Sequence, residues 1–170
     1  PGPNNSTGIT GNTTGPSDPL LNAIIPQTTN DAASLEFDFI PSADSLFFRY
    51  LFGSDEYPEF VNSSFNNVFA FFLSGPNPGG GNYINYNVAL IPGTTTPVSI
   101  NNVNNGQNSP PTGPCVNCAY YFDNLAVSNP NPAVEYDGLT TPLVAIASVV
   151  PCATYHIKLA VADAGDSILD

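Results

Sequence analysis

Acidic residues gather in two short stretches of the chain where they could hold a metal ion. LFGSDEYPEF, residues 51–60, and DAGDSILD, residues 163–170, together hold six of the 14 Asp and Glu residues. Each follows an apolar, strand-like segment, and the small pair Ala164-Gly165 permits a tight turn that brings neighbouring carboxylates together. Such hard oxygen ligands suit Ca²⁺, which binds about six to eight of them at flexible angles. We predict a Ca²⁺ site near Asn67 with these ligands: Asp55, Glu56, Asp163, Asp166 and Asp170.

The alternative is that these carboxylates are solvated loop residues, some of which cap turns through their side-chain oxygens. Their spacing does not match an EF-hand loop. We favour Ca²⁺ because the two stretches concentrate the ligand type that this ion prefers.

Paired carboxylates can also hydrolyse glycosides, if one is protonated and the other is ionised about 5–10 Å away. The remaining residues do not support this chemistry. The chain has no Trp to serve as a sugar platform. Ser54 lacks the Gly-x-Ser-x-Gly context of an activated nucleophile, and His156 alternates with apolar neighbours as a strand residue does. We therefore expect a protein that is not an enzyme.

Composition limits the partners. The 170 residues have a net charge of −12, and Arg49 and Lys158 are the only Lys or Arg residues. With so few cations, binding to nucleic acid or to an anionic membrane is not expected. The longest apolar runs are far shorter than the ~20 residues of a membrane-spanning helix, so we expect no membrane insertion. The chain begins PGPNNSTG, without Met or a signal sequence, which indicates a mature product or a segment of a longer protein.

Three cysteines allow one disulfide. Cys115 and Cys118 lie in GPCVNCAYY, and Cys152 follows Pro151. A zinc site would usually need a fourth ligand, and the only His alternates with apolar residues, so we favour a disulfide over zinc. Cys118 is the expected member, and its partner, Cys115 or Cys152, is left open by the sequence.

Apolar residues recur with the period of two that is typical of β-strands. In SLEFDFI, residues 34–40, Leu35, Phe37 and Phe39 alternate with Glu36 and Asp38. The other expected strands are 45–52, 67–74, 82–91, 97–100, 119–122, 143–150 and 154–162, separated by turns rich in Gly, Pro and Asn. Strands without intervening helices predict an all-β fold, an antiparallel β-sandwich like a jelly roll, over residues 31–170. Residues 1–30 lack this pattern and are expected to form an extended N-terminal arm.

Several longer motifs resemble one known family. LFGSDEYPEFVNSSFNNVFAFFLSGP, YYFDN, EYDGLTTPL and PCATYHIKLAVADAGDSILD resemble the choice-of-anchor L domain, found in large secreted surface proteins of bacteria, notably Bacteroidota. The resemblance spans roughly residues 31–170 and implies an adhesin or surface-structure module at the bacterial cell surface or outside the cell. Two departures stand out: members often have Phe-Asn-Asp where this chain has Phe65-Asn66-Asn67, and they commonly continue past Asp170 into another apolar strand.

We therefore expect a secreted, Ca²⁺-dependent module for adhesion or surface structure, whose partners are copies of itself, other surface proteins or glycans. The alternative is a lectin-like domain that recognises carbohydrate through the same loops. Tyr83, Tyr86, Tyr120 and Tyr121 stand beside Asn-rich loops and could form a glycan-binding face, although core packing is the default for such residues.

The expected missing strand suggests assembly by strand exchange. A sheet that lacks a strand has an open edge that pairs readily with another chain. The apolar run LLNAII in the arm is the candidate donor, through Leu20, Leu21, Ile24 and Ile25, and would build a fibre of head-to-tail subunits. The alternative is a chain that is part of a longer polypeptide.

Overall fold

The computed structural model describes residues 15–125 and 133–166, and these residues form an antiparallel all-β structure. One short 3₁₀ turn, η1 (Cys118–Tyr120), accompanies ten strands. The strands are β1 (Thr29–Phe39), β2 (Ser45–Tyr50), β3 (Gly53–Ser54), β4 (Val68–Pro76), β5 (Asn82–Asn87), β6 (Val98–Ser99), β7 (Tyr121–Asp123), β8 (Gly138–Thr140), β9 (Leu143–Ser148) and β10 (Tyr155–Ala164). Within this part of the chain, no helix is long and apolar enough to span a membrane. The all-β, antiparallel prediction is confirmed, and jelly-roll connectivity stays a prediction.

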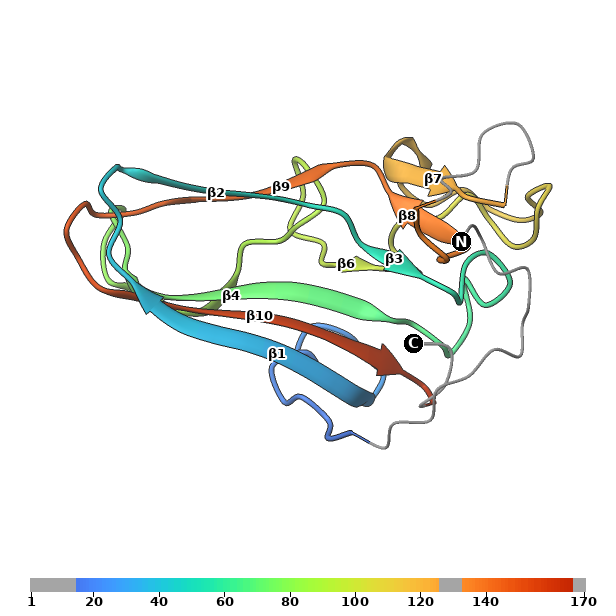
Figure 1. The fold of residues 1–170 in the computed structure, drawn as a ribbon, viewed down its shortest axis with the longest axis horizontal. Helices are drawn as coiled ribbons and strands as arrows, with labels where there is room; N and C mark the ends of the chain where they lie inside the picture. Colours follow the sequence, from blue (N-terminus) through green and yellow to red (C-terminus); the bar gives the residue numbers. More distant parts are fainter. Residues whose placement is uncertain (1–14, 126–132, 167–170) are drawn as a thin grey trace.

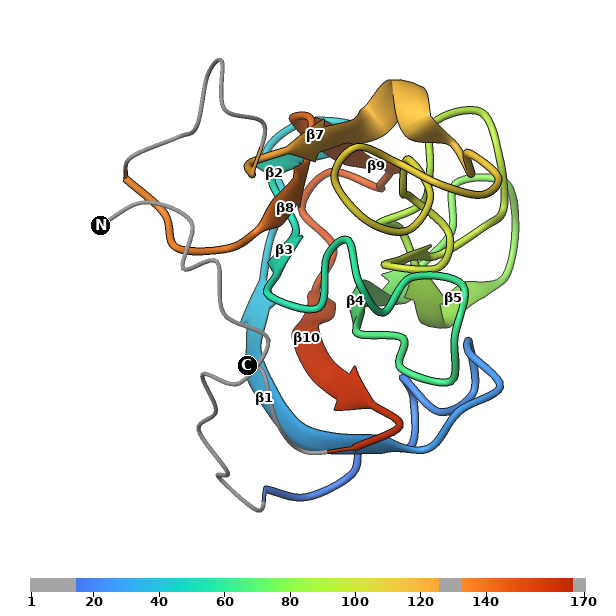
Figure 2. The same ribbon diagram turned by 90° about the vertical axis from the view of Figure 1, so that its right-hand side faces the viewer.

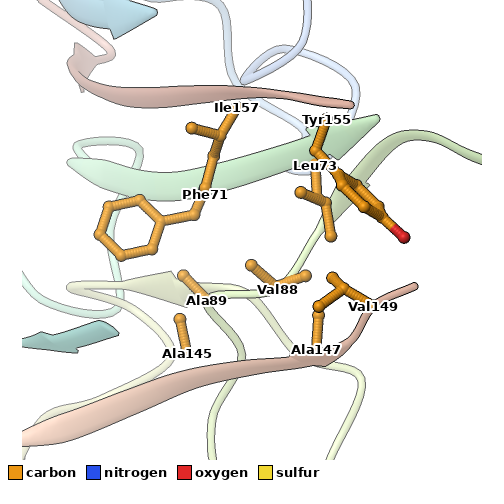
Figure 3. Close-up of a cluster of buried hydrophobic side chains, with 9 residues drawn as sticks. All are labelled: Phe71, Leu73, Val88, Ala89, Ala145, Ala147, Val149, Tyr155 and Ile157. Carbon is orange, nitrogen blue, oxygen red and sulfur yellow. The ribbon is translucent and has the colours of Figure 1, made fainter. Parts of the chain in front are cut away.

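The strands form two layers of unequal width. The wide layer has the order β1-β10-β4-β5, with β6 also paired to β4. The facing layer contains the two-stranded sheet β2-β9, and a small sheet β3-β8-β7 lies beyond its end (Figure 1). The main core fills the space between β2-β9 and the wide sheet. It contains side chains from both layers, including Phe71 and Ile157 on one side and Ala145 and Ala147 on the other (Figure 3).

Alternation in β1 decides which side chains point to the core face of the wide sheet. Phe37 lies opposite Ile157 of β10, so both point to the core face. On the other face Glu36 lies opposite Lys158, and the His156 ring contacts the carboxylate of Asp38 at 2.8 Å. The prediction for residues 34–40, and the assignment of His156 to a strand, are thus confirmed.

The wide sheet is covered on its outer face by residues 18–26, which form turns below it in Figure 1. Leu21 and Ile25 are buried there against one patch of small and apolar side chains: Val68, Ala70, Phe72, Ala160, Ala162 and Ala164. Three of these are alanines on β10, so the covering segment can approach the sheet closely. β4 is therefore apolar on both faces because it is buried on both. Residues 45–52, SLFFRYLF, are also apolar on both faces. There β2 is not buried on both faces, since Phe47 is 62% exposed.

Asp18 fastens this segment to the sheet. Its Oδ1 accepts hydrogen bonds from the amides of Leu20 and Leu21, and its Oδ2 lies 2.6 Å from Nζ of Lys158. Burial opposes ionisation of Asp18, but the hydrogen bonds from Lys158 and the two amides outweigh it and lower the pKa. Because the folded-state pKa is depressed, the stabilisation is present above the ordinary Asp pKa and is lost as the pH falls through the folded-state value.

The expectation that LLNAII lies in an extended arm is therefore wrong for this run. Leu21 and Ile25 are core residues, Leu20 and Ile24 pack against them, and the run forms turns rather than a strand. The boundary expected at residue 31 falls inside β1, which begins at Thr29. As a strand donor, this run would first have to give up its own buried contacts.

Leu21→Ala should lower the free energy of unfolding by about 2–5 kcal/mol, because it removes a fully buried side chain and leaves a cavity. Denaturant-induced unfolding measures the change. Leu51→Ala is the matched control, since Leu51 is largely exposed, and should cost less than about 0.5 kcal/mol. Equal, small effects from both variants would contradict the packing of residues 18–26 on the sheet.

Candidate functional site

Asn67 joins the two predicted acidic loops at one end of the molecule. Its Nδ2 donates to Oγ of Ser54 at 3.2 Å, and its Oδ1 accepts from the amide of Ala164 at 3.2 Å. Oγ of Ser54 in turn accepts from the amide of Glu56 at 3.0 Å. A single buried amide side chain thus ties the loop after β3 to the end of β10, as the prediction of Asn67 near the site requires.

Two of the predicted ligands are buried at this end. Glu56 is 1% exposed and Asp163 is 4% exposed. Asp163, Asn67 and Ser54 line a cavity of about 310 Å³, which Asp31 also lines. Asp31 lies where the register of β1 shifts against β10, with a positive φ of 48°, and its carboxylate accepts from the Gly15 amide. Sequence reasoning missed Asp31, because a bulge inside a strand leaves no mark in the alternation of residues.

The other predicted ligands are placed less closely. The backbone carbonyl of Asp166 accepts a hydrogen bond from Nδ2 of Asn30 at 2.7 Å, and Asp55 follows directly after β3. Asp170 lies outside the described residues. Within residues 15–125 and 133–166, no three His, Cys, Asp or Glu side chains are grouped so that they could hold a metal ion. The Ca²⁺ site stays a prediction.

Tyr57, in the first acidic loop, is a core residue. It is fully buried, its hydroxyl donates to the carbonyl of Val103 at 2.6 Å, and its ring contacts that of Tyr121 at 4.9 Å. Burial first, and then Tyr121, raise the pKa of Tyr57 well above its ordinary value. Tyr57 therefore anchors the acidic loop to the loop at Val103.

Glu59, in the same loop, also has a raised pKa. Burial is the main cause, a backbone hydrogen bond opposes the rise, and the charge of Asp123 adds to it.

An apolar shelf on β1 and β10 is the second candidate site. The β1 shelf consists of core-face residues at the free edge of the wide sheet: Ala33, Leu35, Phe37, Leu159 and Val161. Leu35 lies opposite Leu159, which packs against the main core, yet Leu35 is 60% exposed and Val161 is 42% exposed. Most of the shelf, with Phe69, lines an open cavity of about 330 Å³. The β2-β9 layer thus leaves Leu35 and Val161 exposed to solvent at this edge.

The shelf adjoins the acidic end, because Ala33 and Val161 line both cavities. In the described residues, β1 pairs only with β10 and β2 only with β9. The free edge of β1 and the apolar shelf therefore lie together, with the carboxylates of Asp31 and Asp163 at one end.

A family model, the choice-of-anchor L domain, matches residues 1–170. The chain belongs to the choice-of-anchor L family. The match includes the first 30 residues, which the motifs quoted from the sequence did not reach. Neither a comparison with curated proteins nor one with solved structures found a match for this choice-of-anchor L domain.

The cysteines of this choice-of-anchor L domain are placed by the structure. Cys115 and Cys118 form a disulfide with their Cα atoms 5.5 Å apart, and Cys152 is an exposed free cysteine. The predicted disulfide at Cys118 is confirmed with Cys115 as its partner, and the alternative with Cys152 is not formed. A disulfide is consistent with the oxidising surroundings of a secreted or surface protein, as the family also suggests.

Proposed function

We propose that this choice-of-anchor L domain is a secreted bacterial surface module that joins surface structures by binding another surface protein at the β1 shelf. It acts by binding and not as an enzyme. The observation that carries the proposal is the exposure of core-face side chains, above all Leu35, on a strand that pairs only with β10 in the described residues. The Ala32 amide donates to the carbonyl of Pro16, but no other strand in the described residues covers the outer edge from Ala33 to Phe39. Contiguous exposed apolar surface of this kind marks sites of protein association.

The geometry favours an extended strand as the partner. Free edges offer backbone N–H and C=O groups in register for β-augmentation, and apolar side chains on alternate positions of the added strand would cover Leu35 and Val161. The carboxylates of Asp31 and Asp163 border the same surface, so a Lys or Arg at one end of the partner strand would be complementary.

A second copy of this chain would be a poor partner for two reasons. The net charge of −12 opposes close approach of two copies. The run LLNAII, which would have been the donor, is buried on its own sheet through Leu21 and Ile25. We therefore assign the strand to a different surface protein.

The proposal retains Ca²⁺ as a stabiliser of the acidic end. Its support is the burial of Glu56 and Asp163 beside Asn67, an arrangement of hard oxygen donors in a chain with only two Lys or Arg residues. Bound Ca²⁺ would be a favourable neighbour for such carboxylates.

Site-specific crosslinking on the cell surface tests the partner. A photoreactive benzoylphenylalanine in place of Leu35 should crosslink to a different surface protein, because this position faces the bound strand. The matched control is the same substitution at Glu36, the next residue, which faces the opposite side of β1 and should not give that product. Crosslinks from position 35 that stay within its own chain, or join two copies, would contradict the proposal.

Thermal unfolding tests the Ca²⁺ prediction. At 100 times its dissociation constant, Ca²⁺ should add about 2.7 kcal/mol if only the folded chain binds it, which corresponds to a rise in Tm of roughly 5–10 °C. Asp163→Asn should abolish the response to Ca²⁺, whatever its own Tm. Asp44→Asn, at an exposed turn, should leave the response intact. A Tm indifferent to both EDTA and Ca²⁺ would exclude the site.

A further inference from the structure

A β-bulge in β5 sets two tyrosines side by side. Leu73 and Gly75 of β4, two residues apart, lie opposite Tyr86 and Tyr83 of β5, which are three apart, so β5 carries one extra residue. Asn85 lies in this bulge with a positive φ of 47°, and its amide donates to Oγ of Ser74 at 2.9 Å. Residues three apart on a regular strand point to opposite faces. The extra residue turns Tyr83 and Tyr86 to the same face, and bulges commonly re-aim side chains in this way.

The two rings form a partly exposed aromatic surface. Their centroids are 5.5 Å apart, with 31° between the planes. The hydroxyl of Tyr83 donates to the carbonyl of Ser148 on β9 at 3.1 Å, which fixes its ring between the layers. Tyr86 has no such hydroxyl contact in the described residues and is 49% exposed. The ring of Tyr83 is therefore held in place, while the ring of Tyr86 is exposed and accessible to a ligand.

The rings line a cleft of about 610 Å³ between β5 and β9. Its lining comprises amide, hydroxyl, aromatic and aliphatic side chains and no charged one: Asn77, Asn82, Tyr83, Ile84, Tyr86, Ile146, Ala147 and Ser148. Burial, and then the neighbours Tyr155 and Tyr86, raise the pKa of the Tyr83 hydroxyl, so it stays neutral at physiological pH. A neutral cleft of this size, in a chain with net charge −12, suits a small uncharged ligand.

We propose that this cleft binds a short neutral oligosaccharide. A pyranose ring has an apolar C–H face that can stack on the Tyr86 ring, and its hydroxyl groups can exchange hydrogen bonds with the amides of Asn77 and Asn82. A purely apolar ligand would displace water from those side chains without replacing its hydrogen bonds, at a cost in free energy. An anionic ligand would find no cation in the lining.

The cleft is distinct from the β1 shelf, because β1 and β5 are opposite edges of the wide sheet (Figure 2). It shares no lining residue with the cavity at the acidic loops, and it contains Tyr83 and Tyr86, two of the four tyrosines that the sequence suggested for a glycan-binding face. The glycan site thus goes beyond the protein-binding function proposed above and can fail or hold independently of it.

A glycan array of neutral and acidic mono- to tetrasaccharides, probed with the whole chain and followed by calorimetry on the best ligand, tests the site. We expect binding to neutral glycans. Tyr86→Ala should weaken it about tenfold or more, because a stacking ring is lost, and Asn82→Ala should also weaken it. Tyr86→Phe keeps the ring and should bind within about threefold of the original chain.

Tyr136→Ala is the matched control, since Tyr136 is a similarly exposed tyrosine at the other cavity, and it should bind glycan like the original chain. Because Tyr86 is half exposed, its variant should keep the original Tm, so that lost binding is not lost folding. Absence of binding to any neutral glycan, binding to acidic glycans alone, or equal binding by Tyr86→Ala would overturn the proposal. Crosslinking from position 35 should be unchanged in Tyr86→Ala, which separates this site from the β1 shelf.

Discussion

The unequal width of the two layers governs the rest of the structure. A wide sheet ordered β1-β10-β4-β5 faces the two strands β2 and β9, so burial is complete only along its middle. Phe71 and Ile157 are therefore buried, whereas Leu35 on the same face is exposed. Both candidate binding surfaces are the sides that the narrow layer leaves open: the β1 shelf on one and the tyrosine cleft beside β5 on the other.

The outer face of the wide sheet is covered by residues 18–26 and not by a second sheet. Alanines at alternate positions of β10 let residues 18–26 pack closely, and the ion pair of Asp18 with Lys158 fastens them. Because Lys158 is one of two Lys or Arg residues in the chain, this pair uses half of the available positive charge. Removal of one member of such a poorly exposed pair is generally costly, so the segment behaves as part of the domain.

Sequence patterns predicted the elements that depend on local alternation. Residues 34–40 form a strand with the expected faces, and β4, β9 and β10 fall where apolar runs indicated them. Tertiary effects were not visible in the same way. The turns at Leu21 and Ile25 bury an apolar run that resembles a strand, and the bulge at Asn85 is defined only by its partner strand. Short strands such as β3 are too brief to carry a period.

The acidic end was partly predictable. The sequence indicated that the loop at Glu56, Asn67 and the loop at Asp163 belong together, and hydrogen bonds through Ser54 and Asn67 connect them. It did not indicate Asp31, which joins them from a bulge in β1. Composition and loop position can nominate ligands, but which carboxylates share a cavity depends on register between strands distant in sequence.

Residue-level hydrogen exchange of the backbone amides tests most directly whether β1 is an uncovered edge. In the isolated chain, alternate amides of β1 between Ala33 and Phe39 should exchange rapidly, since in the described structure these residues pair on one side only. Amides of β10, which pairs with β1 and β4, should be protected along the strand from Ile157 to Val161. Uniform protection along β1, equal to that of β10, would mean that this edge is already covered and would contradict the shelf as a binding surface.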